Sequence, residues 1–300
     1  MKMDAVNNKV FYQYKILVQL KDQLSIESLS YANLSVREVK NNLLRQIYEY
    51  ICKTDNYIEF DSNGKFISIK KNYIYNNDIL VFKLAKKKSL NITAKKDEFV
   101  DEITNDYPYS LVILDVKGQT FYVEKNYKLF QKPSEMSKIL IDFLSHIQSI
   151  TKIYKDANFL VNLIVDKQEF IECFNSFDMV NKVSLKLNSP NSFLGNQKAD
   201  DFLNTLRDET NAQETKIDIV NNEIGINSAG FMKHFDDLFE YAVNGGGEWS
   251  LQGKEKGKKV TKHSAAKGKS LVLNIDVNNI QVNANEIMVI LEKENRYEKD

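Results

Sequence analysis

The stretch that decides the fold runs from Tyr57 to Ile69 and reads YIEFDSNGKFISI. Two short runs, each with apolar residues at alternate positions, flank the dipeptide Asn63-Gly64. Alternation with a period of two is typical of a strand with one buried face, and Asn-Gly is the strongest short signal of a hairpin turn. The stretch therefore predicts two antiparallel strands joined by a tight turn, and it disfavours a parallel βαβ array.

Segments on both sides of this hairpin continue the β pattern. The run from Val10 to Leu20 alternates apolar residues in the manner of a strand. One early helix is predicted near residues 35–52, because Ser35 and Glu38 have the spacing of a capping box. Further strands are expected at residues 78–84, 89–93, 110–116 and 119–125, and a tight turn at Lys117-Gly118 joins the last two.

The pattern changes after Lys132-Pro133, which interrupts the run of hairpins. Helices are expected at residues 134–150, 167–177, 198–210 and 230–243, and strands at residues 159–165, 182–188, 216–220, 270–277 and 287–293. The chain is therefore predicted to have an α+β fold in two lobes. A hairpin-rich antiparallel sheet with one early helix would form a domain over residues 1–128, and a mixed α+β domain would span residues 129–300.

Charge is balanced over the whole chain but uneven along it. The sequence has 41 basic and 41 acidic residues among 300, so the molecule is not a polycation. Residues 65–96, however, hold nine lysines and one acid, whereas residues 198–240 hold ten acids and four bases. Local patches, and not the net charge, are therefore expected to select the partners of this protein.

The most basic segment lies between residues 245 and 269 and reads GGGEWSLQGKEKGKKVTKHSAAKGK. Its glycines and its few apolar residues predict a basic loop over residues 253–269 that is poorly ordered by itself. A mobile, positively charged loop on a folded body attracts a phosphate backbone, although a solvated surface loop is the alternative. The candidate nucleic-acid-binding residues are Lys254, Lys256, Lys258, Lys259, Lys262, His263, Lys267 and Lys269, together with Lys70, Lys71, Lys86, Lys87 and Lys88.

Aromatic residues offer a second route to nucleic acid. Twelve of the fifteen tyrosines lie between Tyr12 and Tyr127. Tyrosine suits the half-buried face of a sheet, so packing is their expected role. Some of them would be able to stack on bases.

The sequence predicts no metal site, no disulfide and no cofactor. Cys52 and Cys173 lie in apolar helical patterns without a second cysteine or a histidine at ligand spacing, which fits a reducing cytoplasm. The amino-terminal stretch has no apolar core of a signal peptide, and no apolar run approaches the ~20 residues that cross a bilayer. We therefore expect a cytoplasmic protein without direct membrane insertion.

One enzymatic pattern has to be weighed. Asp115-Val116-Lys117 has the D-x-K form found in metal-dependent nucleases of the restriction type, and Asp101, Glu102 or Asp106 would supply the upstream acid. In such a site the carboxylates hold Mg²⁺ while the lysine assists attack of water on a phosphodiester. The motif is short, and a lysine before Gly118 is equally typical of a turn.

In the order of its segments the chain resembles the RexA-like phage-exclusion proteins, a set of bacterial defence proteins that includes the B subunit of the Kiwa system. The resemblance rests on Phe11, Tyr12 and Tyr14, Leu43-Leu44, IEFDSNGKFISIKK, SLVILDVKGQTFYVEKN, Asp142-Phe143-Leu144 and the LNSPN segment. The GGGEW segment and the lysine-rich stretch depart from the family, so no contact residue is carried over. The resemblance implies a two-lobed α+β dimer that binds DNA without strong sequence preference and acts against phage.

Three functions therefore compete at the level of the sequence. The first is a non-enzymatic sensor or effector of an abortive-infection or exclusion system that binds double-stranded DNA non-specifically as a homodimer or higher oligomer. The second is a metal-dependent nuclease that uses Asp115 and Lys117. The third is an interaction subunit of a defence complex, whose acidic segment over residues 198–240 docks a basic partner protein.

Overall fold

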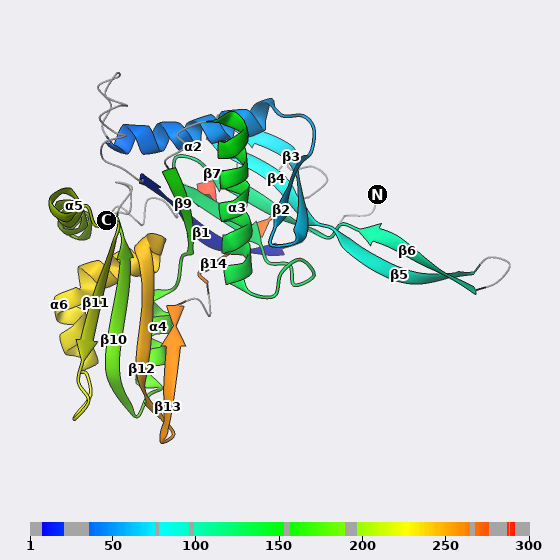
Figure 1. Cartoon of the computed structure of the whole chain (residues 1–300). Helices are drawn as coiled ribbons and strands as arrows, with labels where there is room; N and C mark the ends of the chain where they lie inside the picture. The colour runs from blue at the N-terminus through cyan, green and yellow to red at the C-terminus, as the bar shows by residue number, and fades with distance from the viewer. Residues whose placement is uncertain are drawn as a thin grey trace.

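The computed structural model describes residues 8–20, 36–75, 78–95, 99–152, 157–189, 197–264, 268–275, 287 and 289–291. Within this part of the chain a large antiparallel sheet, a smaller one and several helices form two lobes (Figure 1). The α+β class predicted from the sequence is confirmed.

The large lobe is built on an eight-stranded sheet. Its order is β14 (Ser270–Asn274), β1 (Asn8–Leu20), β8 (Thr120–Glu124), β7 (Tyr109–Asp115), β4 (Ile79–Lys86), β3 (Lys65–Tyr75) and β2 (Ile58–Ser62), and β9 (Ala157–Leu163) also pairs with β1. The pairings are antiparallel. Asn63 and Gly64 have φ of 52° and 75°, which is the type I′ turn that the sequence predicts between β2 and β3.

Two helices cover one face of this sheet. They are α2 (Val36–Lys53) and α3 (Pro133–Thr151). The predicted apolar stripe of α2 is buried, since Val39, Leu43 and Ile47 are at most 1% exposed. Ser35, the predicted cap of α2, lies outside the described residues.

A second, smaller core lies on the opposite face and includes Phe11, Leu273, Ile287 and Leu291. The strand predicted at residues 287–293 is wrong, because the described residues of this range are helical. Ile287 and Leu291 are both buried and are four positions apart, as on one side of a helix. A short apolar run does not distinguish a strand from a buried helix, so the sequence alone favoured the wrong element.

The small lobe is an insertion between β9 and β14. The chain leaves the large sheet after Leu163 and returns at Ser270. In between come α4 (Lys167–Asn175), β10 (Met179–Asn188), α5 (Gln197–Thr210), β11 (Glu214–Val220), α6 (Ser228–Tyr241), a π-helical turn (Ala242–Gly246), β12 (Gly247–Glu255) and β13 (Lys258–His263). The four strands form an antiparallel sheet in the order β11-β10-β12-β13, and α4 and α6 pack behind it around Phe170 and Trp249.

The predicted domain boundary at residue 128 does not separate the two lobes. Elements on both sides of this position belong to the large lobe: β1 to β8 precede it, and α3, β9 and β14 follow it. Whether residues 1–128 and 129–300 fold as independent domains stays a prediction.

Up to residue 263 the basic segment is a β-hairpin and not the predicted loop over residues 253–269, and residues 265–267 lie outside the described residues. Lys256 and Gly257 have φ of 50° and 74°, so they form the same type of turn as Asn63-Gly64. Trp249, Leu251 and Gly253 alternate into the core and hold β12 against β10. At Gly253 an added Cβ would lie 2.1 Å from the carbonyl oxygen of Met179, so this glycine allows the strands to approach closely.

A separate two-stranded sheet, β5 (Lys88–Lys95) with β6 (Phe99–Asp106), forms an arm that projects from the large lobe (Figure 1). The strand β6 was not predicted, because its sequence FVDEITND holds three acids and little alternation. Leu90, Ile92 and Ile103 of the arm are 42%, 43% and 77% exposed. An isolated two-stranded hairpin is marginal in water, so this arm depends on the body or on a partner.

A buried lysine lies on α2. Lys40 is 3% exposed. Burial, with the nearby guanidinium of Arg207 as the second cause, lowers the pKa of Lys40 from 10.5 to about 7. Between these two values the unfolded chain binds a proton that the folded chain does not, so the stability of the fold rises with pH in this window.

We predict that Lys40→Met stabilises the protein at pH 7 and reduces the rise of the unfolding free energy between pH 7 and pH 10. The expected change is at most about 1.4 kcal/mol per pH unit, because one group contributes one proton. Urea unfolding at several pH values measures it. Lys53→Met on the exposed end of the same helix is the control, and an equal slope in both variants would contradict the prediction.

Candidate nucleic-acid interface

The small sheet has one open face. The helices α4 and α6 cover one side, and the other side presents polar residues of all four strands. On this open face Lys254 of β12 lies directly opposite Lys259 of β13, and both side chains are exposed. Like charges directly opposite each other destabilise a sheet, so this pair favours an anion as its neighbour.

Two more lysines extend the basic patch to the end of the hairpin. Lys256 is in the turn and Lys258 begins β13, and both are exposed. We call Lys254, Lys256, Lys258 and Lys259 the hairpin tip. Among the described residues no carboxylate lies within ion-pair distance of these four amines.

Among the other predicted residues of this segment, the amine of Lys262 has local partners. Lys262 is held by Glu255 at 2.9 Å and by the Ser176 hydroxyl at 2.6 Å, and its amine lies 5.0 Å from the centre of the Phe177 ring. His263 is exposed opposite Ser250. The amide of Lys269 donates to Ile164 O at 2.8 Å, and Lys267 lies outside the described residues.

Lysines elsewhere on the open face are neutralised. Lys182 pairs with Asp218 at 2.9 Å, and Lys186 pairs with Glu214 at 2.8 Å. Hydrogen bonds from Ser184 and Lys182 lower the pKa of Asp218 to about 2. The lysines of the small sheet that have no ion pair among the described residues are therefore those of the hairpin tip.

The second predicted group of lysines lies on and beside β3 and β4, where most of its amines have local partners. Lys71 donates to the carboxylate of Asp55 at 2.9 Å, and Lys86 lies 3.7 Å from Glu135. Lys88 donates to the carbonyl of Lys128. Lys87 is exposed and its amine lies 5.8 Å from the ring of Phe66.

Lys70 belongs to a different environment, which the sequence did not indicate. It lines a hollow of about 520 Å³ on the outer face of the large sheet. The other lining residues are Tyr57, Glu59, Ser68, Lys83, Ala85, Tyr107 and Tyr109. Lys83 and the three tyrosines were missed as site residues, because they are brought to Lys70 by strand pairing and are up to 39 positions away from it in the chain.

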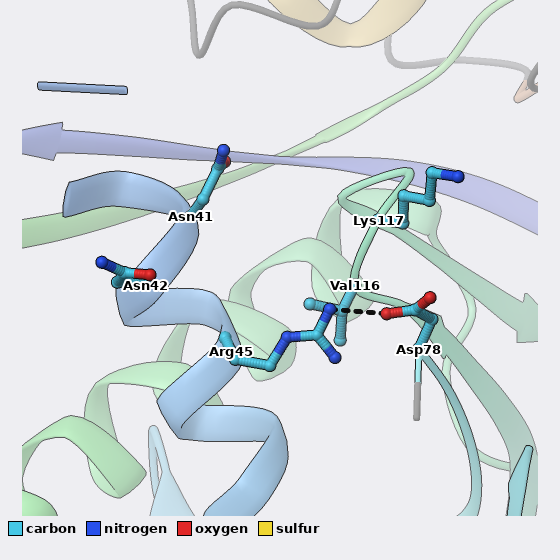
Figure 2. Close-up of a pocket in the computed structure, with 6 residues that line it drawn as sticks. All are labelled: Asn41, Asn42, Arg45, Asp78, Val116 and Lys117. Atoms are coloured by element: carbon cyan, nitrogen blue, oxygen red, sulfur yellow. Dashed lines mark hydrogen bonds and ion pairs between the residues drawn. The ribbon is translucent and has the colours of Figure 1, made fainter. Parts of the chain in front are cut away.

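Lys117 of the alternative nuclease site lies at a different pocket, of about 410 Å³. Figure 2 shows Lys117 on its rim, with the guanidinium of Arg45 turned toward Asp78 at 2.5 Å. Asp115 is 4% exposed, and its Oδ1 accepts the amide of Gly118 at 2.8 Å. In this structure the carboxylate of Asp115 therefore stabilises the turn that follows β7.

The proposed upstream acids are distant from Asp115. Asp101 and Glu102 are on β6 in the arm. Asp106 precedes β7, whereas Asp115 ends it, and a strand of this length separates its ends by about 20 Å. In the part of the chain that the structure describes, no group of three or more His, Cys, Asp or Glu residues is placed to hold a metal ion.

The acidic segment over residues 198–240 is divided between α5, β11 and α6. Several of its acids have basic neighbours, as in Lys167–Asp236 at 2.7 Å and Lys198–Asp237 at 3.5 Å. This pairing weakens the negative patch on which docking of a basic partner would depend.

Comparison of the chain with protein-family models, with curated proteins and with solved structures finds no match. The resemblance to the RexA-like proteins therefore stays a prediction from the sequence. None of the helices described is both long enough and apolar enough to cross a membrane.

We predict that Asp115→Ala destabilises the protein by about 1–3 kcal/mol, because the part-buried amide of Gly118 loses its acceptor. Lys117→Ala, at the exposed neighbouring position, is the control and should change stability by less than about 0.5 kcal/mol. Urea unfolding measures both. A metal-binding carboxylate without a structural role would instead leave stability unchanged or increase it when removed.

Proposed function

We propose that the protein binds double-stranded DNA without sequence preference through the hairpin tip. The observation that supports this most strongly is the opposed pair Lys254 and Lys259, beside two further exposed lysines and without a carboxylate partner among the described residues. A role as sensor or effector in defence against phage is part of the proposal and rests on the resemblance alone.

Charge alone accounts for the proposed lack of sequence preference. Lysine amines on a projecting hairpin reach phosphate oxygens, which are the same on every duplex. Each phosphate that is neutralised releases a counterion, so the logarithm of the affinity falls with the logarithm of the salt concentration by about 0.9 per contact. The hairpin already sets the backbone from which these lysines project, so less backbone ordering is needed on binding than for a flexible loop.

We predict that changing Lys254, Lys256, Lys258 and Lys259 to Gln weakens binding of unrelated duplexes to a similar extent. The salt slope should become shallower by about 2–4, since not every amine contacts a phosphate at once. Fluorescence anisotropy with labelled 20-base-pair duplexes at several salt concentrations measures this.

A matched control removes the same charge elsewhere, by changing the exposed Lys132, Lys138, Lys152 and Lys233 to Gln. Equal affinity and salt slope in the tip variant and the parent would overturn the proposal. Each titration is repeated with Mg²⁺ and with a chelator. Binding that persists in the chelator supports the non-enzymatic function, and shortening of DNA only with Mg²⁺ would favour the nuclease.

We also propose that the protein is a homodimer joined through the β5–β6 arm. The support is the exposure of Leu90 and Ile92 on one face of an arm that has no third strand among the described residues. Burying this face against a second copy would remove apolar area from water.

We predict a dimer mass for the parent in light scattering and a monomer mass for the variant Leu90→Ser with Ile92→Ser. Ile224→Ser, at an isoleucine of the small lobe that is 86% exposed, is the control and should remain dimeric. A monomeric parent at micromolar concentrations would rule out the proposal.

A further inference from the structure

A second basic surface lies on the large lobe, on the face of the sheet opposite α2 and α3. Strand pairing defines its geometry: Glu59 of β2 lies opposite Ser68 of β3, Ser68 opposite Ala85 of β4, and Ala85 opposite Tyr109 of β7. The two small side chains in the middle of this row leave a depression between a glutamate and a tyrosine. This is the floor of the hollow of about 520 Å³, which we call the tyrosine hollow.

The next row of the sheet supplies positive charge. Lys70 and Lys83 lie directly opposite each other on β3 and β4. The amine of Lys70 is 5.0 Å from the centre of the Tyr57 ring, and that of Lys83 is 4.7 Å from the centre of the Tyr109 ring. Each ammonium is thus positioned against an aromatic ring, an arrangement that holds a cation without neutralising it.

Neither amine forms an ion pair with a carboxylate among the described residues. Lys70 donates to the backbone carbonyl of Asp55, and the carboxylate of Asp55 is engaged by Lys71. For Lys83 the ring contact is the interaction that the structure shows. The two lysines lie directly opposite each other on neighbouring strands, so an anion in the hollow would be attracted by both amines.

The walls of the hollow are aromatic and open to solvent. Tyr57, Tyr107 and Tyr109 are 62%, 45% and 39% exposed, which is unusual for three large rings around one depression. Exposed aromatic rings beside amines are the combination by which proteins hold unpaired bases: the base stacks on a ring and the phosphate meets the amine. The volume is within the range of pockets for small ligands and cofactors.

We propose that the tyrosine hollow binds a nucleotide whose base is unpaired, with the base against Tyr57 or Tyr109 and the phosphate between Lys70 and Lys83. The carboxylate of Glu59, at the edge of the same hollow, would accept a hydrogen bond from an exocyclic amino group. The nucleotide either belongs to a single-stranded stretch of DNA, in which case the inference extends the proposed function, or is free in solution.

The hollow is separate from the hairpin tip. It lies on β2, β3, β4 and β7 of the large lobe, whereas the tip lies on β12 and β13 of the small lobe (Figure 1). The two surfaces therefore predict separable activities, duplex binding at one and recognition of unpaired bases at the other.

The test measures fluorescence anisotropy with a labelled 12-nucleotide oligo(dC) and a labelled duplex, and calorimetry with CMP. Changing Tyr57 and Tyr109 together to Leu should weaken oligo(dC) binding by at least about 5-fold, since one stacked base is worth roughly 5- to 150-fold in affinity. Duplex binding should stay as in the parent, because no charge is removed. The matched double change to Phe keeps the rings and should bind oligo(dC) as the parent does.

A second variant, Lys70→Gln with Lys83→Gln, tests the phosphate contact and covers the case in which the Leu variant fails to fold. It should weaken oligo(dC) binding and make its salt slope shallower. If the parent binds CMP and both variants weaken this binding, free nucleotides are ligands of the hollow. If the parent binds oligo(dC) but not CMP, the ligand is a single strand.

Oligo(dC) binding that neither variant weakens, or a parent that binds neither oligo(dC) nor CMP, would overturn the inference. Duplex binding at the hairpin tip is tested separately, by the loss of duplex binding in the hairpin-tip variant. A failure of the tyrosine-hollow proposal is therefore distinguishable from a failure of the hairpin-tip proposal.

Discussion

The pairing of β1 is the constraint on which the rest of the structure depends. This strand pairs with β8, β9 and β14, and its residues enter all three cores: Ile16 lies with α2 and α3, Leu17 with the small lobe, and Phe11 with the opposite face. The chain enters the small lobe and returns from it beside β1, where the amide of Lys269 donates to Ile164 O at 2.8 Å. At Gly245, which has φ of 90°, an added Cβ would lie 2.4 Å from the Cβ of Lys15. The small lobe thus packs against β1 through a glycine that no other residue replaces without strain.

The inserted lobe repeats the arrangement of the large one. Each lobe covers one side of an antiparallel sheet with helices and leaves polar side chains exposed on part of the other. On each exposed surface two lysines lie opposite each other on neighbouring strands: Lys254 with Lys259, and Lys70 with Lys83. Such a pair costs stability in the free protein, and a phosphate bound beside it would offset that cost, as both proposals require.

The candidate site was only partly predictable from the sequence. The lysines of the hairpin tip are close together in the chain, so their common position could be inferred, although the turn was missed because Lys256 occupies a position where Asn is more usual. The tyrosine hollow was not predictable. Tyr57 directly precedes β2 and Tyr109 begins β7, and only the register of the sheet, with β3 and β4 between them, brings the two residues together.

The sequence by itself determined the elements whose signals are local: the Asn63-Gly64 hairpin, the apolar stripe of α2, and the α+β class that follows from them. Only the tertiary structure decided which lysines keep an uncompensated charge, because the acids that neutralise Lys71, Lys86 and Lys262 come from other turns, helices and strands. The helix at residue 287, like the hairpin at residue 256, was decided by burial against neighbouring elements. Local patterns set conformational preferences of a few tenths of a kcal/mol per residue, roughly, and packing against distant segments outweighs them.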